Sequence, residues 1–304
     1  MKFYSNFILL ILIFSLFGCK KEEKTDYVDL IEVLDNSKDA VFDTLSVPEY
    51  LIPIVKQISG INTYETGVLG KGVTESPNFE NFKKLNKLAS EDELLSLLNN
   101  KNKTVAVYAS IGILDKKPEL IDKIFLSFLN MKTKIHTQNG CIIGDQNLAE
   151  PLYRKYLYSL DDKAQRSDRM LQKLDSIIIF GKNSPESLLQ EALRYKVYPK
   201  NYRKRIEILA FKEHKIPAIR YLSHWHKGDY SGFLQKELIS LVENDSLGDI
   251  QNKMYLSDLL SFRNPNNKDF ILNYIKKDTL YSNEYEILHQ LESNGIQSGE
   301  YPTK

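Results

Sequence analysis

The sequence predicts a mainly α-helical protein, and three observations support this prediction. From Phe79 to the C-terminus, apolar residues recur at helical spacing in a succession of short segments. The composition is that of an ordinary folded chain, rich in Lys, Asn, Ile, Leu and Tyr, with only 10 Pro and 14 Gly in 304 residues. Polar turns separate the segments. Because helices this short are not stable alone in water, we expect them to pack on one another.

Residues 29–78 are expected to form a loop-rich N-terminal part with few helices. A short helix is predicted around Asp29 to Leu34, and a better one from Pro48, since a proline in the first turn loses no hydrogen bond. The stretch from Ser59 to Pro77 lacks helical periodicity and holds four glycines. We therefore expect a long irregular excursion there, with room for a short hairpin.

The helical part begins at Phe79. Ser90 and Glu93 form a capping box before the apolar run Leu94 to Leu98. A second helix is predicted from Thr104 to Leu114, with Val105, Tyr108, Ala109 and Gly112 on one side. Further helices are predicted over residues 120–129, 148–160, 166–180, a segment capped by Ser184-Pro185, 201–211, 216–226, 232–243, 252–262, 269–276 and 284–292.

A polar segment, residues 132–145, interrupts the helices. Asn139-Gly140 fits the two-residue type I′ turn, and the apolar pair Ile142-Ile143 follows shortly after it. We therefore expect a small β-hairpin in this segment.

Residues 90–130 carry a resemblance to a known repeat family. The run Leu94 to Leu98, the Asn-rich turn, the run Val105 to Ala109, Gly112 and the helix that Pro118 opens resemble a HEAT-type helical repeat. The resemblance implies an irregular α-solenoid, in which stacked helical hairpins bury their apolar faces, and makes residues 79–304 a helical-repeat domain. No strict period of about 40 residues runs through the chain, so divergent repeats and a non-repetitive helical array both remain open.

The N-terminus has the parts of a secretory signal. Lys2 precedes an uncharged run of eleven residues from Phe7 to Phe17, and Gly18 and Cys19 follow it. An eleven-residue helix covers roughly 16 Å, about half of a ~30 Å hydrocarbon core, so this run is not expected to span a membrane. Leu16 to Cys19 resembles the lipobox of bacterial lipoproteins.

The lipobox resemblance implies removal of residues 1–18 as a signal peptide and attachment of a diacylglycerol to Cys19. Residues 19–28, nearly all polar or charged, are then expected to form a flexible tether. Lys20 stands where an aspartate commonly retains lipoproteins at the inner membrane, so the resemblance implies the outer membrane. Lys21-Glu22-Glu23 also resembles a signal for export to the cell surface, which leaves the periplasmic and surface sides both open.

Charge and cysteine content exclude several classes of protein. Removal of residues 1–18 deletes one charged residue, Lys2, so the 41 basic residues become 40, against 40 acidic ones. A neutral chain has no general attraction to nucleic acid, so no nucleic-acid partner is expected. With Cys19 acylated, Cys141 is the remaining cysteine, and no intramolecular disulfide can form.

The sequence offers little catalytic or metal-binding chemistry. His224 and His226 are two residues apart, whereas a helical zinc pair needs a spacing of four. Cys141 with His136 suggests a thiolate and a base, but a free Cys beside Ile142 is more often a small apolar residue. The chain contains none of the Gly-x-Ser-x-Gly, Ser-x-x-Lys or His-Glu-x-x-His motifs. We therefore predict no catalytic residue, no metal and no cofactor.

One mixed aromatic and basic stretch is a candidate partner-binding surface. Tyr and Arg are the residue types that anchor protein interfaces. The alternative is a solvated helix face with Tyr rings half buried between helices. The candidate residues are Arg194, Tyr195, Tyr198, Tyr202, Arg203 and Arg205.

Two classes of function fit these observations. The first is a lipid-anchored, non-enzymatic helical scaffold that binds an unknown envelope or secreted protein, with a toxin-neutralising immunity lipoprotein as a special case. The second is an envelope-polymer hydrolase whose acid and base carboxylates come from separate helices. A deep pocket with two carboxylates of raised pKa would favour the enzyme, and a shallow groove lined by Tyr and Arg would favour the scaffold.

Overall fold

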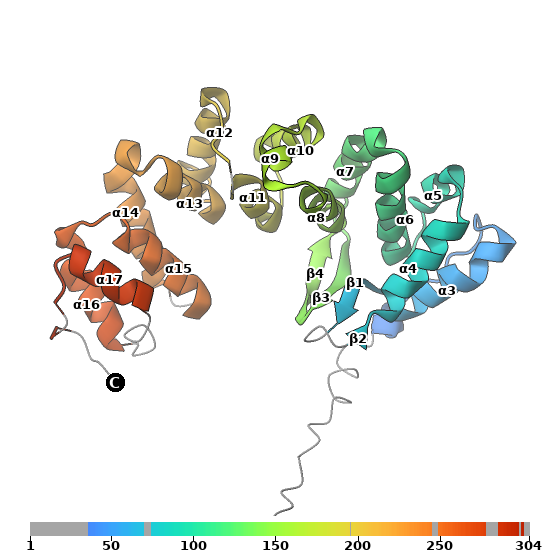
Figure 1. Cartoon of the computed structure of the whole chain (residues 1–304), viewed down its shortest axis with the longest axis horizontal. Helices are drawn as coiled ribbons and strands as arrows, with labels where there is room; N and C mark the ends of the chain where they lie inside the picture. Colours follow the sequence, from blue (N-terminus) through green and yellow to red (C-terminus); the bar gives the residue numbers. More distant parts are fainter. Residues whose placement is uncertain are drawn as a thin grey trace, which may run out of the picture.

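The chain is mainly helical, as the sequence predicts, and carries one small sheet (Figure 1). The computed structural model describes residues 36–69, 74–194, 196–244, 249–277, 285–297 and 299–300. The predicted signal peptide, Cys19, the tether, the helix expected at residues 29–34 and Tyr195 lie outside the described residues. Within the described residues, every helix is too short or too polar to cross a membrane.

Most helices from α4 onward begin and end close to the predicted bounds. The single helix predicted over residues 166–180 is divided at Asp168 into α9 and α10, and α14 begins at Lys227 rather than at residue 232. The α-helices are α3 (Ile52–Ile61), α4 (Pro77–Leu88), α5 (Glu91–Leu97), α6 (Lys103–Lys116), α7 (Ile121–Leu129), α8 (Ala149–Ser159), α9 (Asp162–Ser167), α10 (Arg169–Phe180), α11 (Glu186–Leu193), α12 (Lys200–Phe211), α13 (Ile216–Trp225), α14 (Lys227–Glu243), α15 (Asp249–Leu260), α16 (Lys268–Lys277) and α17 (Tyr285–Ser293). The short 3-10 helices are η1 (Asn36–Asp39), η2 (Glu49–Leu51), η3 (Pro118–Leu120) and η5 (Pro265–Asn267).

Contacts between helices arrange the chain from α6 onward in a long row and a shorter one. In one row α6, α8, α11, α13, α15 and α17 each contact the next, and in the other α7 contacts α10, which contacts α12. The rows are joined where α7 meets α8, α10 meets α11, and α12 meets α13, while α14 contacts α13 and α15 of the first row. Figure 1 shows the helices following one another along an arc from α3 to α17. Each helix therefore buries its apolar surface mostly against its neighbours in the chain.

Polar side chains set where several helices begin. The capping box predicted at α5 is confirmed, since Ser90 Oγ accepts a hydrogen bond from the Glu93 amide at 3.3 Å and Glu93 Oε2 accepts one from the Ser90 amide at 2.7 Å. Asn102 caps α6 in the same way. The cap predicted at Ser184 is wrong, because the Ser184 hydroxyl instead donates to the carbonyl of Ile178 at 2.7 Å, near the end of α10.

Two predictions about helices in the first half of the chain are corrected. The helix predicted from Pro48 opens as η2 and continues as α3 through Ser59 and Gly60, which were expected to be irregular. Ile58 and Ser59 are fully buried, so packing outweighs the weak helical pattern there. Helix α6 is buried on every side from Thr104 to Leu114 rather than on one side. It is the central helix that α3, α4, α5, α7 and α8 surround.

The sheet has the strand order β2-β1-β3-β4, formed by β1 (Thr63–Leu69), β2 (Thr74–Glu75), β3 (Lys134–Gly140) and β4 (Ile142–Asn147). Strands β3 and β4 form the predicted hairpin, and β1 and β2 form a second, very short one. Strand β1 pairs with β3 in parallel, with Thr63 opposite His136. No local sequence pattern predicted that pairing, which joins the loop-rich N-terminal part to the helical part.

The turn of the predicted hairpin lies one residue later than expected. Asn139 pairs with Ile142, so Gly140 and Cys141 form the turn, and Gly140 adopts a φ of 58°. Asn139 stays in the strand, where its side-chain oxygen accepts a hydrogen bond from Thr66 Oγ1 of β1 at 2.9 Å.

Tyr108 fastens α6 to β1. Its buried hydroxyl donates to the carbonyl of Glu65 at 3.0 Å and accepts from the amide of Glu65 at 2.9 Å. The buried Glu65 carboxylate in turn accepts from Ser76 Oγ at 2.6 Å and from the Asn78 amide at 2.8 Å. Burial raises the pKa of Glu65, and these two hydrogen bonds act in the opposite direction. The start of α4, β1 and α6 are therefore held together by one hydrogen-bonded cluster.

Replacing Tyr108 with Phe tests this connection. The substitution leaves a buried amide and a buried carbonyl without their partner, so we expect it to lower the free energy of unfolding by about 1 to 3 kcal/mol. Urea unfolding of the chain without its signal peptide measures the loss. Tyr64→Phe is the matched control, because the Tyr64 ring packs against Tyr108 with centroids 5.1 Å apart. Equal losses for the two variants would contradict the assigned role of the Tyr108 hydroxyl.

Candidate functional site

The structure separates the residues of the predicted partner-binding stretch. Tyr198 lies in the connection between α11 and α12 and is only 8% exposed. Its hydroxyl hydrogen-bonds to Asp175 Oδ2 at 2.9 Å and to the Ala192 carbonyl at 2.7 Å. Its amide donates to the Tyr221 hydroxyl at 2.8 Å. Tyr198 is thus a core residue, which corrects the expectation that its ring is offered to a partner.

Both arginines of α12 contact neighbouring helices. Arg203 forms an ion pair with Asp229 of α14 and donates from Nε to the Tyr230 hydroxyl at 3.1 Å. Arg205 donates from Nε to the Ile179 carbonyl at 3.1 Å, at the end of α10. Tyr202 stacks on Tyr198 with centroids 5.1 Å apart. These residues match the alternative in which the rings are half buried between helices, and of the candidate residues Arg194, Tyr198 and Tyr202 line the groove described below.

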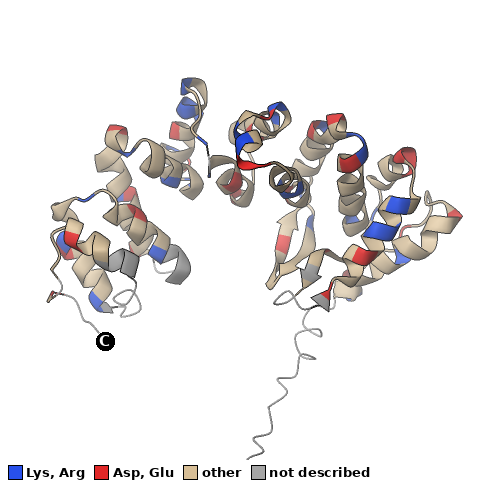
Figure 2. Ribbon diagram, viewed as in Figure 1, with Lys and Arg blue, Asp and Glu red and all other residues tan. Residues whose placement is uncertain are grey.

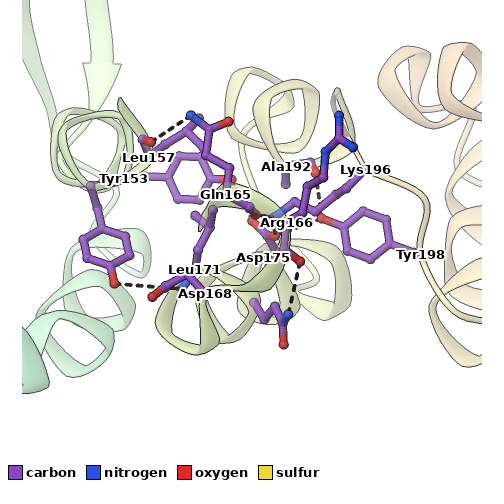
Figure 3. A network of polar contacts seen from close by, with 12 residues as sticks. Tyr153, Leu157, Gln165, Arg166, Asp168, Leu171, Asp175, Ala192, Lys196 and Tyr198 are labelled. Carbon is purple, nitrogen blue, oxygen red and sulfur yellow. Dashed lines mark hydrogen bonds and ion pairs between the residues drawn. The ribbon is translucent and has the colours of Figure 1, made fainter. Parts of the chain in front are cut away.

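A buried carboxylate, Asp175 of α10, lies at the centre of this region (Figure 3). Its side chain is fully buried and forms an ion pair with Lys196. Tyr153 of α8 donates to Asp175 Oδ1 at 2.7 Å, and the Tyr198 hydroxyl reaches Oδ2. The Lys196 ammonium also donates to the Gln165 carbonyl at 3.3 Å. The Asp175 network, defined as Asp175, Tyr153, Lys196 and Tyr198, therefore ties α8, α10 and the connection after α11 together.

Burial controls the protonation of the Asp175 network. It raises the pKa of Asp175, while the charge of Lys196 acts in the opposite direction. Burial and the nearby carboxylate also raise the pKa values of Tyr153 and Tyr198, which keeps both hydroxyls protonated as donors. With a fully buried carboxylate, the network is suited to structural support rather than to contact with a substrate.

Two surface pockets meet at Trp225, the one tryptophan of the chain. The first, about 510 Å³, lies across α11, α13 and α15 and is lined by residues that include Arg194, Arg220, His224, Tyr255 and Asp258. The second, also about 510 Å³, lies across α9, α10 and the start of α12 and is lined by residues that include Arg166, Gln172, Lys196, Val197 and Tyr202. We call the two pockets together the Trp225 groove.

The lining of the Trp225 groove combines aromatic rings with a surplus of positive charge. Its one carboxylate is Asp258, which accepts a hydrogen bond from Arg220 Nε at 2.7 Å. Burial raises the pKa of Asp258, and Arg220 acts in the opposite direction. Arg166, Arg194 and Lys196 add three more cations to the lining. Figure 2 shows basic and acidic positions interspersed along the ribbon.

Trp225 is 38% exposed at the end of α13. The His224 ring packs edge-on against the Trp225 ring, with centroids 4.4 Å apart. Sequence reasoning examined His224-Trp225-His226 only as a metal pair and missed Trp225 as a surface residue. Its position as the chain's single tryptophan, directly before a helix end, was the available signal. Among the described residues, no group of three His, Cys, Asp or Glu side chains is placed to hold a metal ion.

The structure does not bring Cys141 and His136 into a catalytic pair. Cys141 is exposed in the turn after β3, whereas His136 lies five residues earlier, on that strand. The His136 ring instead contacts Asp145 of β4, with Nδ1 2.7 Å from Oδ1.

Replacing Lys196 with Met tests the Asp175 network. Because the folded-state pKa of Asp175 is raised, the folded state holds a proton more tightly than the unfolded state, and its stability falls as pH rises above about 3.8. Without Lys196 the pKa of Asp175 rises further. The substitution should therefore lower the free energy of unfolding only slightly near pH 4, and by about 3 kcal/mol at neutral pH. Urea unfolding across this pH range measures it, with exposed Lys155→Met on α8 as the control. A loss independent of pH would contradict the assignment.

Comparisons with known proteins give no match, so a functional assignment depends on the residues of the chain itself. No protein-family model matches this chain, and no curated protein or solved structure is significantly similar to it.

Proposed function

We propose that this protein is a lipid-anchored envelope scaffold without enzymatic activity, which binds another envelope or secreted protein through the Trp225 groove. The observation that carries the proposal is the groove itself, in which an exposed tryptophan lies with four cations, namely Arg166 on α9, Arg194 and Lys196 in the segment after α11, and Arg220 on α13. Trp, Tyr and Arg are the residue types that supply most of the binding energy at protein interfaces.

The proposal includes an irregular α-solenoid of HEAT-like helical hairpins. The two rows of helices support it, since the helix pairs α7 with α8, α10 with α11 and α12 with α13 each contribute one helix to each row. Stacked hairpins present long surfaces on which a partner can lie, and the first pocket crosses three consecutive helices of one row, α11, α13 and α15. The partner is expected to present an acidic segment, because the four cations of the groove outnumber Asp258 and the buried Asp175 that pairs with Lys196.

The alternative of an envelope-polymer hydrolase receives less support. Three described carboxylates have a raised pKa, namely Glu65 on β1, Asp175 on α10 and Asp258 on α15. They lie on separate elements and bind different partners, and only Asp258 lines the Trp225 groove. Glycoside hydrolysis usually needs two carboxylates that flank one bond. An immunity lipoprotein remains the special case in which the bound partner is a toxin.

The location is proposed from the N-terminal sequence. Leu16 to Cys19 supports acylation of Cys19 after removal of residues 1–18, and Lys20 supports the outer membrane. Tether residues 19–28 would then connect the lipid to the helical body, on either the periplasmic or the surface side. The near-equal numbers of basic and acidic residues, 41 and 40, give no support to a nucleic-acid partner.

Acylation is tested by replacing Cys19 with Ser. Cells that express the variant and incorporate radiolabelled fatty acid should yield an unlabelled protein, because the serine hydroxyl does not replace the sulfur that accepts the lipid. Cys141→Ser is the control and should keep the full label. Equal labelling of the Cys19→Ser variant and the native chain would rule out the proposed anchor.

Partner binding is tested by replacing Trp225 with Ala. Loss of a central aromatic anchor costs about 2 kcal/mol, so we expect about thirtyfold weaker recovery of a partner from detergent-solubilised envelopes. Phe233→Ala is the matched control, since Phe233 is 36% exposed against 38% for Trp225 and is not part of the groove lining. Identical partner recovery with both variants, each confirmed as folded by circular dichroism, would argue against the groove as the binding site.

A further inference from the structure

Three large apolar side chains are exposed close together between η1 and η2. Val41 is 47% exposed, Phe42 is 59% exposed and Leu45 is 92% exposed. Leu45 is the most exposed large apolar side chain of the described residues. Single exposed apolar residues are ordinary, but a contiguous group marks a surface that meets another apolar phase.

Hydrogen bonds hold this segment in place. The Asp43 carbonyl accepts from Asn100 Nδ2 at 2.8 Å, and Asp43 Oδ2 accepts from the Lys101 amide at 3.0 Å. On its C-terminal side, Val47 is buried in the core. Leu45 lies between these two fixed points, and Phe42 directly precedes the first of them. These hydrogen bonds therefore fix the backbone in a conformation that leaves the side chains of Phe42 and Leu45 exposed.

The position of the segment in the chain indicates what it meets. Sixteen residues, 20–35, separate Cys19 from the first described residue, Asn36, and even fully extended they span at most about 55 Å. If Cys19 carries the lipid, as the proposed function requires, this end of the array stays beside the bilayer. Tethering raises the effective concentration of the membrane surface at the segment.

We propose that residues 41–45, the apolar loop, insert into the lipid interface and lay the α3 end of the array on the bilayer. Aromatic and aliphatic side chains are stable at the boundary between head groups and acyl chains. Exposed Lys38 and Lys101 flank the loop and suit the phosphates of phospholipid head groups. Asp39 beside the loop is also exposed, and the Asp43 carboxylate within it accepts from the Lys101 amide. A diacylglycerol already gives stable anchoring through two chains, so the loop sets orientation rather than membrane attachment.

The test uses the full acylated protein in vesicles of phosphatidylethanolamine and phosphatidylglycerol. In a Cys141→Ser background an environment-sensitive dye is attached at Ser46→Cys, beside the apolar loop, and nitroxide-labelled phospholipid serves as the quencher. We expect severalfold stronger quenching at position 46 than at the control position, Ser127→Cys, another exposed serine, on α7. Adding Phe42→Ser and Leu45→Ser should reduce quenching at position 46 to the control level while leaving the protein in the vesicle fraction.

Several results would overturn the proposal. Equal quenching at positions 46 and 127, or quenching at 46 that survives the double substitution, would show that the apolar loop does not enter lipid. A dye shift in detergent that grows with protein concentration would instead identify a second copy as the occupant. Thiol titration of the Cys141→Ser chain distinguishes failure of the lipid anchor from failure of the apolar loop, because a reactive thiol in this variant means that Cys19 is not acylated. That result would remove the anchor and, with it, the basis for the apolar loop.

Discussion

The groove depends on one buried carboxylate. Asp175 binds Tyr153 through one oxygen, and Tyr198 and Lys196 through the other, and so fixes the connection that leads from α11 into α12. Tyr198 then donates from its amide to Tyr221 of α13. Lys196 and Tyr198 line one pocket of the Trp225 groove, and Tyr221 lines the other. Burying the charge is costly, which explains why three partners surround it.

This arrangement gives the aromatic and basic residues different roles. Tyr198, Arg203 and Arg205 connect helices, whereas Trp225 and Arg166 face the space that a partner can occupy. Tyr and Arg, which are common at protein interfaces, also link the helices of an array to one another. Their long side chains reach from one helix to the carbonyls and carboxylates of the next. Residue type alone therefore does not separate the two roles.

Sequence reasoning succeeded where the cause was local. The capping box of Ser90 and Glu93 and the strand pair around Gly140 depend on residues close together in the chain, and both are present. The parallel pairing of β1 with β3 was not predicted, because it joins Thr63 to His136, far along the sequence. The extent of burial was predicted wrongly for the same reason. Helix α6 is enclosed by elements on both sides of it in the chain, and the residues that hydrogen-bond to Tyr198 come from α10, α11 and α13.

The central claim is that the Trp225 groove is where another protein binds. In-cell photo-crosslinking tests it most directly, with a photoreactive phenylalanine analogue placed at Val197, which lines the groove and is 57% exposed. Leu88 on α4, 52% exposed, supplies the matched control position. The account predicts a discrete adduct with one other protein from position 197 and none from position 88. Absence of an adduct at 197, or the same adducts from both positions, would contradict it.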